Sequence, residues 1–187
     1  MLDTVCARRV MPGVRCYLVM IVNDYNGTGF WSVDAVRGRY ELYARRYGVA
    51  LFHDLSPRLH TENGKRWIYP VMECVIECIE KGDLACAEIG VEFIEENVSF
   101  PFGGILKSNT ARALRRVPLT DEQKNRIRKR VVEMLCTGYL PREYRQYAKL
   151  ARKIGLEEWL SQVERKADLN NVWVKHYYKY FKEQAIG

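Results

Sequence analysis

Glycine and proline residues divide the chain from Ser32 onward into short segments, most of which carry apolar residues at helical spacing. The first segment begins after Ser32, a favourable N-cap, and ends at Gly48, a favourable helix stop. A later segment opens with Thr120 and Gln123 at the spacing of a capping box and ends at Gly138. Short amphipathic helices bury their apolar faces by packing against one another, so this pattern predicts a domain of antiparallel helices.

About seven or eight helices are predicted, with links of roughly two to six residues, the usual length between antiparallel neighbours. They cover residues 33–47, 70–81, 83–97, 105–117, 121–137, 141–154, 156–167 and 172–185. Residues 49–66, which contain Pro57 and Gly64, are predicted to form a short helix with a loop or an irregular connection. Strand patterns of comparable strength are confined to the N-terminal arm. The predicted fold class is therefore all-α, with a single helical domain over residues 32–187.

Residues 1–31 are predicted to form an N-terminal arm. Arg8, Arg9 and Arg15 precede a short apolar run at residues 16–22, an arrangement that resembles a weak signal peptide. The run is too short to span a bilayer, and a short strand is an equally good interpretation. Met11 and Met20 are alternative starts, in which case the residues before them are not part of the protein.

Two stretches share a glutamate, a glycine and a leucine at an offset of 56 residues: ECIEKGDL at 77–84 and EMLCTGYL at 133–140. Each contains the end of a predicted helix, a glycine turn and the start of the next helix. Over residues 66–155 this layout of helix pairs with short turns resembles HEAT and armadillo-type helical repeats. The resemblance implies a repeat-like stack, an α-α superhelix, and a compact helical bundle is the alternative.

The composition is that of a folded globular domain, with 48% apolar and 28% charged residues in a chain of 187. A chain of this length buries a core without disulfides or metals. Its six cysteines include no C-x-x-C pair. Cys74 and Cys78 lie on one face of a predicted helix, where small buried thiols are expected. We therefore expect reduced thiols, no cofactor and a cytoplasmic protein.

An acidic block spans residues 73–96, with eight carboxylates against one lysine. Its glutamates recur at i, i+4 and i+7 on each of two successive predicted helices, so three side chains share a face of each helix. They make up the predicted acidic face: Glu73, Glu77, Glu80, Glu88, Glu92 and Glu95.

A basic block follows over residues 104–154, with 14 lysines or arginines against four carboxylates. On the predicted helix of residues 141–154, its cations form a stripe opposite an apolar face. Together with cations of the two preceding helices they make up the predicted basic face: Arg112, Arg115, Arg116, Arg126, Lys129, Arg142, Arg145, Lys149 and Arg152. The net charge of the whole chain, +7, favours acidic partners.

Solvated helix faces are the simplest interpretation of both blocks, but neighbouring faces of one sign repel unless something balances them. The two blocks meet, within one molecule or between two copies, or the basic face meets a phosphate backbone. The primary hypothesis is a non-enzymatic helical interaction module that binds a protein partner or self-associates. The alternative is a nucleic-acid-binding helical-repeat protein that uses residues 107–153, with Tyr139 or another aromatic residue stacking on a base.

Candidate catalytic and metal-binding residues are few. His53, Asp54, His60 and Glu62 could form a small acid/base or metal cluster, but none of the three histidines has HExxH spacing. We therefore expect binding without catalysis and without a metal.

The last predicted helix carries an aromatic stripe and a lysine stripe. We expect the aromatic stripe, Trp173, Tyr177, Tyr180 and Phe181, to dock on the core. The alternative is that the helix lies on an anionic membrane surface, with Lys175, Lys179 and Lys182 facing the lipid head groups.

Overall fold

The computed structural model describes residues 21–50, 54–96, 98–99 and 101–183. Within these ranges the chain is mostly helical, with eight α-helices and a small three-stranded sheet. The predicted helical fold class is confirmed in outline, and the sheet is an element that the sequence analysis did not predict. The alternative starts Met11 and Met20 lie outside the described residues, as does most of the apolar run that ends at Val22.

The helices lie close to their predicted positions. They are α1 (Val33–Tyr47), α2 (Val71–Glu80), α3 (Leu84–Glu96), α4 (Gly103–Leu114), α5 (Asp121–Thr137), α6 (Tyr144–Ile154), α7 (Leu160–Lys166) and α8 (Val172–Lys182). Short 3-10 turns, η1 (Gly29–Trp31) and η2 (Glu157–Trp159), precede α1 and α7.

Local hydrogen bonds explain where several helices begin. The Oγ of Ser32 accepts a hydrogen bond from the amide of Ala35 at 3.4 Å, and Thr120 and Gln123 form the predicted capping box. The Oδ1 of Asn171 accepts bonds from the first amides of α8. α5 ends at Gly138, whose φ of 70° lies in the left-handed region that favours glycine.

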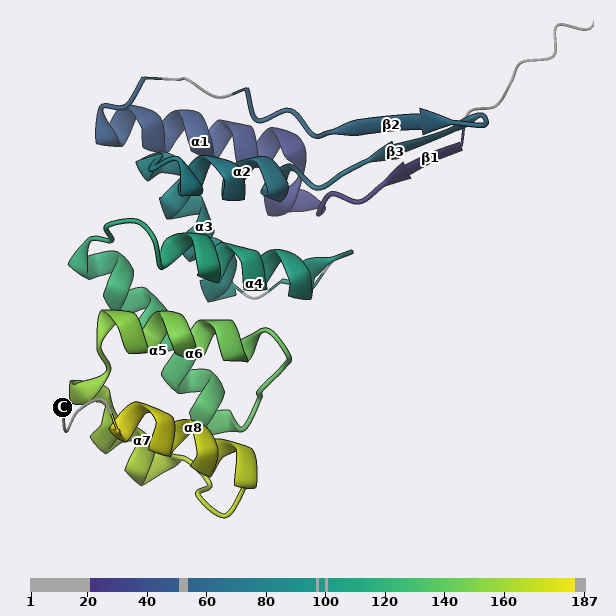
Figure 1. The fold of residues 1–187 in the computed structure, drawn as a ribbon. Coiled ribbons are helices and arrows are strands. Elements are labelled where there is room, and N and C mark those ends of the chain that lie inside the picture. Colours follow the sequence, from purple (N-terminus) through teal and green to yellow (C-terminus); the bar gives the residue numbers. More distant parts are fainter. Residues whose placement is uncertain (1–20, 51–53, 97, 100, 184–187) are drawn as a thin grey trace, which may run out of the picture.

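Two lines of helix contacts run through the molecule (Figure 1). α1, α3, α5 and α7 contact one another in succession, and α2, α4, α6 and α8 do the same. α3 lies at the centre, because it contacts α1, α2, α4 and α5 and has every side chain from residue 85 to 91 buried. One hydrophobic core therefore runs through both lines of helices.

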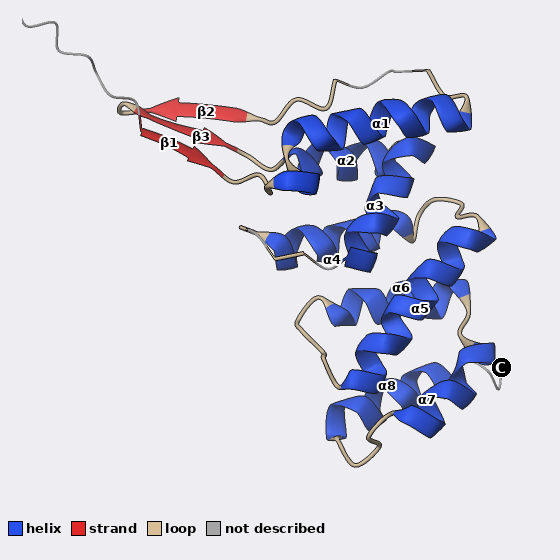
Figure 2. Cartoon of the chain, turned by 180° about the vertical axis from the view of Figure 1, so that it is seen from behind, coloured by secondary structure: helices blue, strands red, loops and turns tan. Residues whose placement is uncertain are grey.

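The three strands extend away from the helices as a narrow sheet (Figure 2). The central strand β3 (Lys65–Ile68) pairs in parallel with β1 (Ile21–Asp24) and antiparallel with β2 (Leu59–Glu62). Asn63 and Gly64 connect β2 to β3 with φ angles of 48° and 72°, the positive values that a two-residue type I′ hairpin requires. The irregular connection predicted for this region is therefore wrong over the hairpin.

The hairpin had one signal in the sequence, the Asn63-Gly64 pair, which is a strong turn signal. The strands themselves carry no clean alternation of buried and exposed residues. All four residues of β2 are exposed, because the sheet extends away from the helices (Figure 2). Alternation of apolar and polar residues marks a strand that buries one face, so strands without a buried face could not be predicted from it.

Trp31 fixes the end of the arm to the helices. Its side chain is buried, its ring packs against Phe93 of α3 at 4.9 Å, and its Nε1 donates a hydrogen bond to Glu96 at 2.8 Å. The guanidinium of Arg39 lies over the rings of Phe30 and Trp31, at 3.7 and 4.3 Å from their centroids.

Candidate functional site

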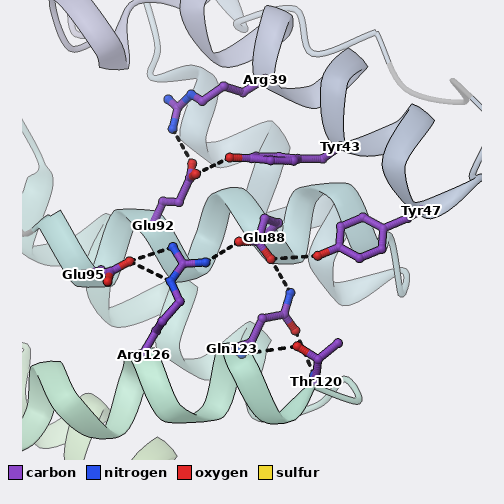
Figure 3. A network of polar contacts seen from close by, with 9 residues as sticks. All are labelled: Arg39, Tyr43, Tyr47, Glu88, Glu92, Glu95, Thr120, Gln123 and Arg126. Carbon is purple, nitrogen blue, oxygen red and sulfur yellow. Dashed lines mark hydrogen bonds and ion pairs between the residues drawn. The ribbon is translucent and has the colours of Figure 1, made fainter.

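The three predicted acidic-face residues of α3 point toward other helices (Figure 3). Glu88 is only 4% exposed and accepts hydrogen bonds from Tyr47 of α1 at 2.9 Å and Gln123 of α5 at 2.7 Å. It also pairs with Arg126. Burial by itself would raise the pKa of Glu88, but these hydrogen bonds outweigh it and hold the pKa below its ordinary value.

Glu92 binds α1 one helical turn further along. Its carboxylate pairs with Arg39 at 2.7 Å and accepts a hydrogen bond from the hydroxyl of Tyr43. Burial and this bond to a carboxylate raise the pKa of the Tyr43 hydroxyl well above its ordinary value. The arginine, the tyrosine and the carboxylate therefore form one fixed polar contact between α1 and α3.

Arg126 of α5 belongs to this inner network, although the sequence placed it on the basic face. Its guanidinium contacts both Glu88 and Glu95, and its Nε and Nη2 donate to the same oxygen of Glu95 at 2.9 and 2.6 Å. The prediction that Arg126 belongs to the basic face is therefore wrong, because its guanidinium is paired with two glutamates of α3. Its charge is balanced inside the molecule.

The predicted acidic residues of α2 are partly paired as well. Glu73 pairs with Arg58, and Glu80 pairs with Arg116 at 2.8 Å. Glu77 is exposed, and no hydrogen bond or ion pair joins its side chain to another described residue. Contact between the acidic and basic blocks within one molecule, one of the arrangements considered from the sequence, therefore occurs at Arg126 and Arg116.

Several other cations of the basic block bind uncharged groups of the chain. Arg128 donates to the carbonyls of Ile154 and Gly155 at the end of α6, and Arg115 donates to Gln146 at 3.3 Å. The guanidinium of Arg152 lies over the ring of Tyr180 at 4.6 Å. These side chains hold helices together, which is the structural reason for part of the basic composition.

Four predicted basic-face residues have neither an ion pair nor a hydrogen bond among the described residues: Lys129, Arg142, Arg145 and Lys149. Arg112 is exposed and bonds only to Asn109 within its own helix. Residues 103–183 hold 19 lysines or arginines against nine acids, whereas residues 21–102 hold eight against 13. The internal pairs thus leave the C-terminal half strongly positive.

Arg112, Arg142, Arg145 and Lys149, which we call the cation row, occupy α4, the link before α6, and α6. Arg112 and Arg142 line one hollow of about 520 Å³, next to Glu143. Arg142 and Arg145 line a second of about 400 Å³, together with Trp173 and Tyr177 of α8. Because the two hollows share Arg142, Arg112, Arg142 and Arg145 follow one another along this surface, which ends at the aromatic residues of α8.

The aromatic stripe of α8 divides between the core and the surface. Phe181 is buried and Tyr177 and Tyr180 are half-buried, as expected for docking, but Trp173 is 67% exposed. The prediction that Trp173 docks on the core is therefore wrong. The sequence carried no local signal for this exposure, because it depends on how α8 packs against α5, α6 and α7.

The histidine candidates do not converge. His60 and Glu62 are exposed on β2, with the imidazole 3.5 Å from the carboxylate, and Asp54 pairs with Arg37 at the same distance. His53 lies outside the described residues. Within the described residues, no group of three or more His, Cys, Asp or Glu side chains is arranged to hold a metal ion.

None of the helices in the described part of the chain combines the length and the hydropathy needed to cross a membrane.

No protein-family model, curated protein or solved structure matches this chain. The resemblance to HEAT and armadillo-type repeats therefore stays a prediction.

Proposed function

We propose that this chain is a helical nucleic-acid-binding protein and that the cation row provides its phosphate contacts. The observation that carries the proposal is that the acidic side chains of α3 are paired within the chain, whereas most of the cation row is not. Glu88, Glu92 and Glu95 of α3 are paired with cations within the chain. Three cation-row residues have no acidic partner among the described residues: Arg142, Arg145 and Lys149. Neighbouring cations without acidic partners can contact the phosphates of a nucleic acid, and the release of counterions from that polyanion favours binding.

The same pairing weakens the case for a dimer held by charge alone. A second copy would need a free acidic surface, and Glu88, Glu92 and Glu95 are occupied by α1 and α5. An external polyanion needs no such surface. Nucleic acid therefore becomes the first candidate, ahead of the protein partner that the sequence favoured.

We further propose that the helices form a repeat-like stack that presents the cation row along one line of helices. Two observations support this. The helices contact one another in two lines, and α3, α5 and α7 begin 37 and 39 residues apart, at Leu84, Asp121 and Leu160. The sequence match between residues 77–84 and 133–140 does not support the stack, because it relates the end of α2 to the end of α5, and these helices lie in different lines.

A cytoplasmic location belongs to the same proposal. The described cysteines, Cys74, Cys78, Cys86 and Cys136, are free thiols, which suits a reducing compartment.

Binding over a salt series tests the function. The full-length chain is titrated onto labelled mixed-sequence DNA and RNA, both single- and double-stranded. We expect the logarithm of the affinity to fall linearly with the logarithm of the salt concentration. Arg142→Ala, Arg145→Ala and Lys149→Ala together should weaken binding and flatten that slope.

A matched control removes three exposed cations from the acidic half: Arg45→Ala, Arg46→Ala and Lys81→Ala. This variant loses the same net charge and should keep most of the affinity. The proposal fails if the wild-type chain binds no nucleic acid at low salt, or if the control variant loses as much affinity as the cation-row variant.

The projecting sheet favours a second candidate function, self-association. Ile21, Val22 and Leu59 are 53–55% exposed on it, and β1 and β2 each pair only with β3 among the described strands. A second copy could add a strand at either edge. Sedimentation over a wide range of protein concentrations tests this. Self-association that Val22→Lys or Leu59→Lys abolishes supports it, and a monomer at every concentration removes it.

A further inference from the structure

The groove between the start of α6 and the first turns of α8 combines positive charge with exposed aromatic surface. We call it the aromatic groove; its lining includes Pro141, Arg142, Arg145, Asn171, Trp173 and Tyr177, and its volume is about 400 Å³. That volume lies within the range of small-molecule sites. Trp173, which lines the groove, is 67% exposed, so most of its side-chain surface is open to solvent.

The aromatic side chains of the groove stand on a fixed support. The ring of Tyr177 packs edge-on against the buried Tyr144 at 4.7 Å, and Tyr144 in turn donates to the carbonyl of Val131 at 3.1 Å. Asn171 caps the amides of Trp173 and Val174, which fixes the first turn of α8. Because those amides are already bonded, the positive groups available to an anion are side chains.

Two guanidinium groups supply that charge. Arg142 and Arg145 line the groove and form no ion pair with any described residue. Arg145 is close enough to Tyr177 for its charge to oppose the rise that burial causes in the pKa of the tyrosine hydroxyl. An anion bound by these arginines would therefore lie beside the aromatic rings.

We propose that the aromatic groove is a base-stacking subsite for single-stranded nucleic acid. A base stacks on the indole of Trp173, and the flanking phosphates pair with Arg142 and Arg145. This inference rests on the proposed function and goes beyond it, because phosphate contacts alone bind duplex and single strand alike. Bases inside a duplex are already stacked and cannot reach Trp173, so the groove makes the chain prefer single strands.

The test compares three labelled probes on the full-length chain at one salt concentration. The probes are an oligothymidylate, an abasic deoxyribose-phosphate strand of equal length, and a duplex of equal length. We expect the wild type to bind the oligothymidylate about tenfold more tightly than the abasic strand. Trp173→Leu should remove that difference and leave binding to the abasic strand and the duplex unchanged.

Phe102→Leu is the matched control, because Phe102 is a 49% exposed aromatic residue that lies outside the groove. It should leave all three affinities unchanged. Trp173→Phe keeps a ring and should give an intermediate preference. Arg142→Ala with Arg145→Ala should weaken binding to all three probes and reduce the single-strand salt slope by about 1.4. The helical circular dichroism of each variant confirms that it is folded.

The outcomes separate this inference from the proposed function. If Trp173→Leu binds every probe as the wild type does, or if the wild type does not distinguish the oligothymidylate from the abasic strand, the stacking subsite is wrong and the phosphate contacts stand. If no probe binds at low salt, both proposals fail. If polyglutamate binds more tightly than every nucleic acid and depends on Trp173, the groove takes acidic polypeptide, which also overturns the inference.

Discussion

The guanidinium of Arg126 donates from Nε and Nη2 to a single carboxylate oxygen of Glu95, at 2.9 and 2.6 Å. The two residues come from the basic and the acidic block, and they join α5 to α3 next to the buried Glu88. The sequence could not distinguish two kinds of cation. Some, such as Arg126, form ion pairs that hold helices together, and others have no acidic partner among the described residues and are available to a binding partner.

Arg126→Gln should therefore affect the stability of the fold, whereas Arg145→Gln should affect nucleic-acid binding. Arg126→Gln leaves Glu88 with an unbalanced buried charge and should lower the free energy of unfolding by about 3 kcal/mol. Once folded, it should keep the salt dependence of nucleic-acid binding. Arg145→Gln should leave stability within about 0.5 kcal/mol and reduce the salt slope by about 0.7. Urea unfolding and fluorescence anisotropy measure the two properties. Equal effects of both substitutions on binding would contradict this division.

Glu88→Gln should make stability less dependent on pH. The folded pKa of Glu88 lies below its ordinary value, so as the pH falls the unfolded chain binds this proton first. Its stabilisation is complete above the ordinary glutamate pKa and is lost as the pH falls through the lower folded value. We expect Glu88→Gln to cost about 2 kcal/mol at neutral pH and progressively less as the pH falls below the ordinary glutamate pKa.

Glu77→Gln is the control for that experiment, because Glu77 is exposed and makes no hydrogen bond or ion pair with a described side chain. Its urea unfolding curves should follow the wild type over the same pH range. A constant difference between wild type and Glu88→Gln across the range would show that the hydrogen bonds to Glu88 do not depend on its charge.

Gly90→Ala should destabilise the fold because α3 passes close to both α2 and α4 at this point. A Cβ there would lie 2.7 Å from Cδ1 of Ile79 and 3.2 Å from Cγ2 of Thr110. We expect a loss of about 1–3 kcal/mol in thermal or urea unfolding.

Gly38→Ala should increase stability, in contrast to Gly90→Ala. Gly38 lies in the exposed middle of α1, and a Cβ there meets nothing within 4 Å. Alanine should stabilise the helix by about 0.5–1 kcal/mol. A destabilising Gly38→Ala would show that this face of α1 is covered in solution.

Gly64→Ala should loosen the sheet and leave the helices unchanged. The residue has a φ of 72°, where alanine costs about 1 kcal/mol or more. Hydrogen exchange should accelerate at the amides of Ile21 and Tyr69, which bond to Gly64 and Arg58 at 3.1 and 2.9 Å. Amides of α3 should keep their protection. Asn63→Gly, which keeps a residue that accepts positive φ, should leave exchange close to the wild type.

Most helix boundaries could be predicted because the interactions that set them are local. The capping box of Thr120 and Gln123 and the stop at Gly138 depend on residues a few positions apart, so the chain carries the whole signal. The hairpin at Asn63 and Gly64 also had a local signal, but its strands bury no face, so the apolar pattern did not reveal it.

The sequence by itself determined the helical segments, their caps and the separation of acidic from basic charge, because each follows from near neighbours or from composition. Only the tertiary structure decided which charges are occupied. Glu88 and Arg126 are 38 residues apart and meet because α3 packs against α5. Arg145 belongs to the same basic block as Arg126, yet it has no acidic partner among the described residues. The exposure of Trp173 was decided in the same way, by how α8 packs against α5, α6 and α7. A contact between distant segments depends on the packing of whole helices, which no single stretch of sequence specifies.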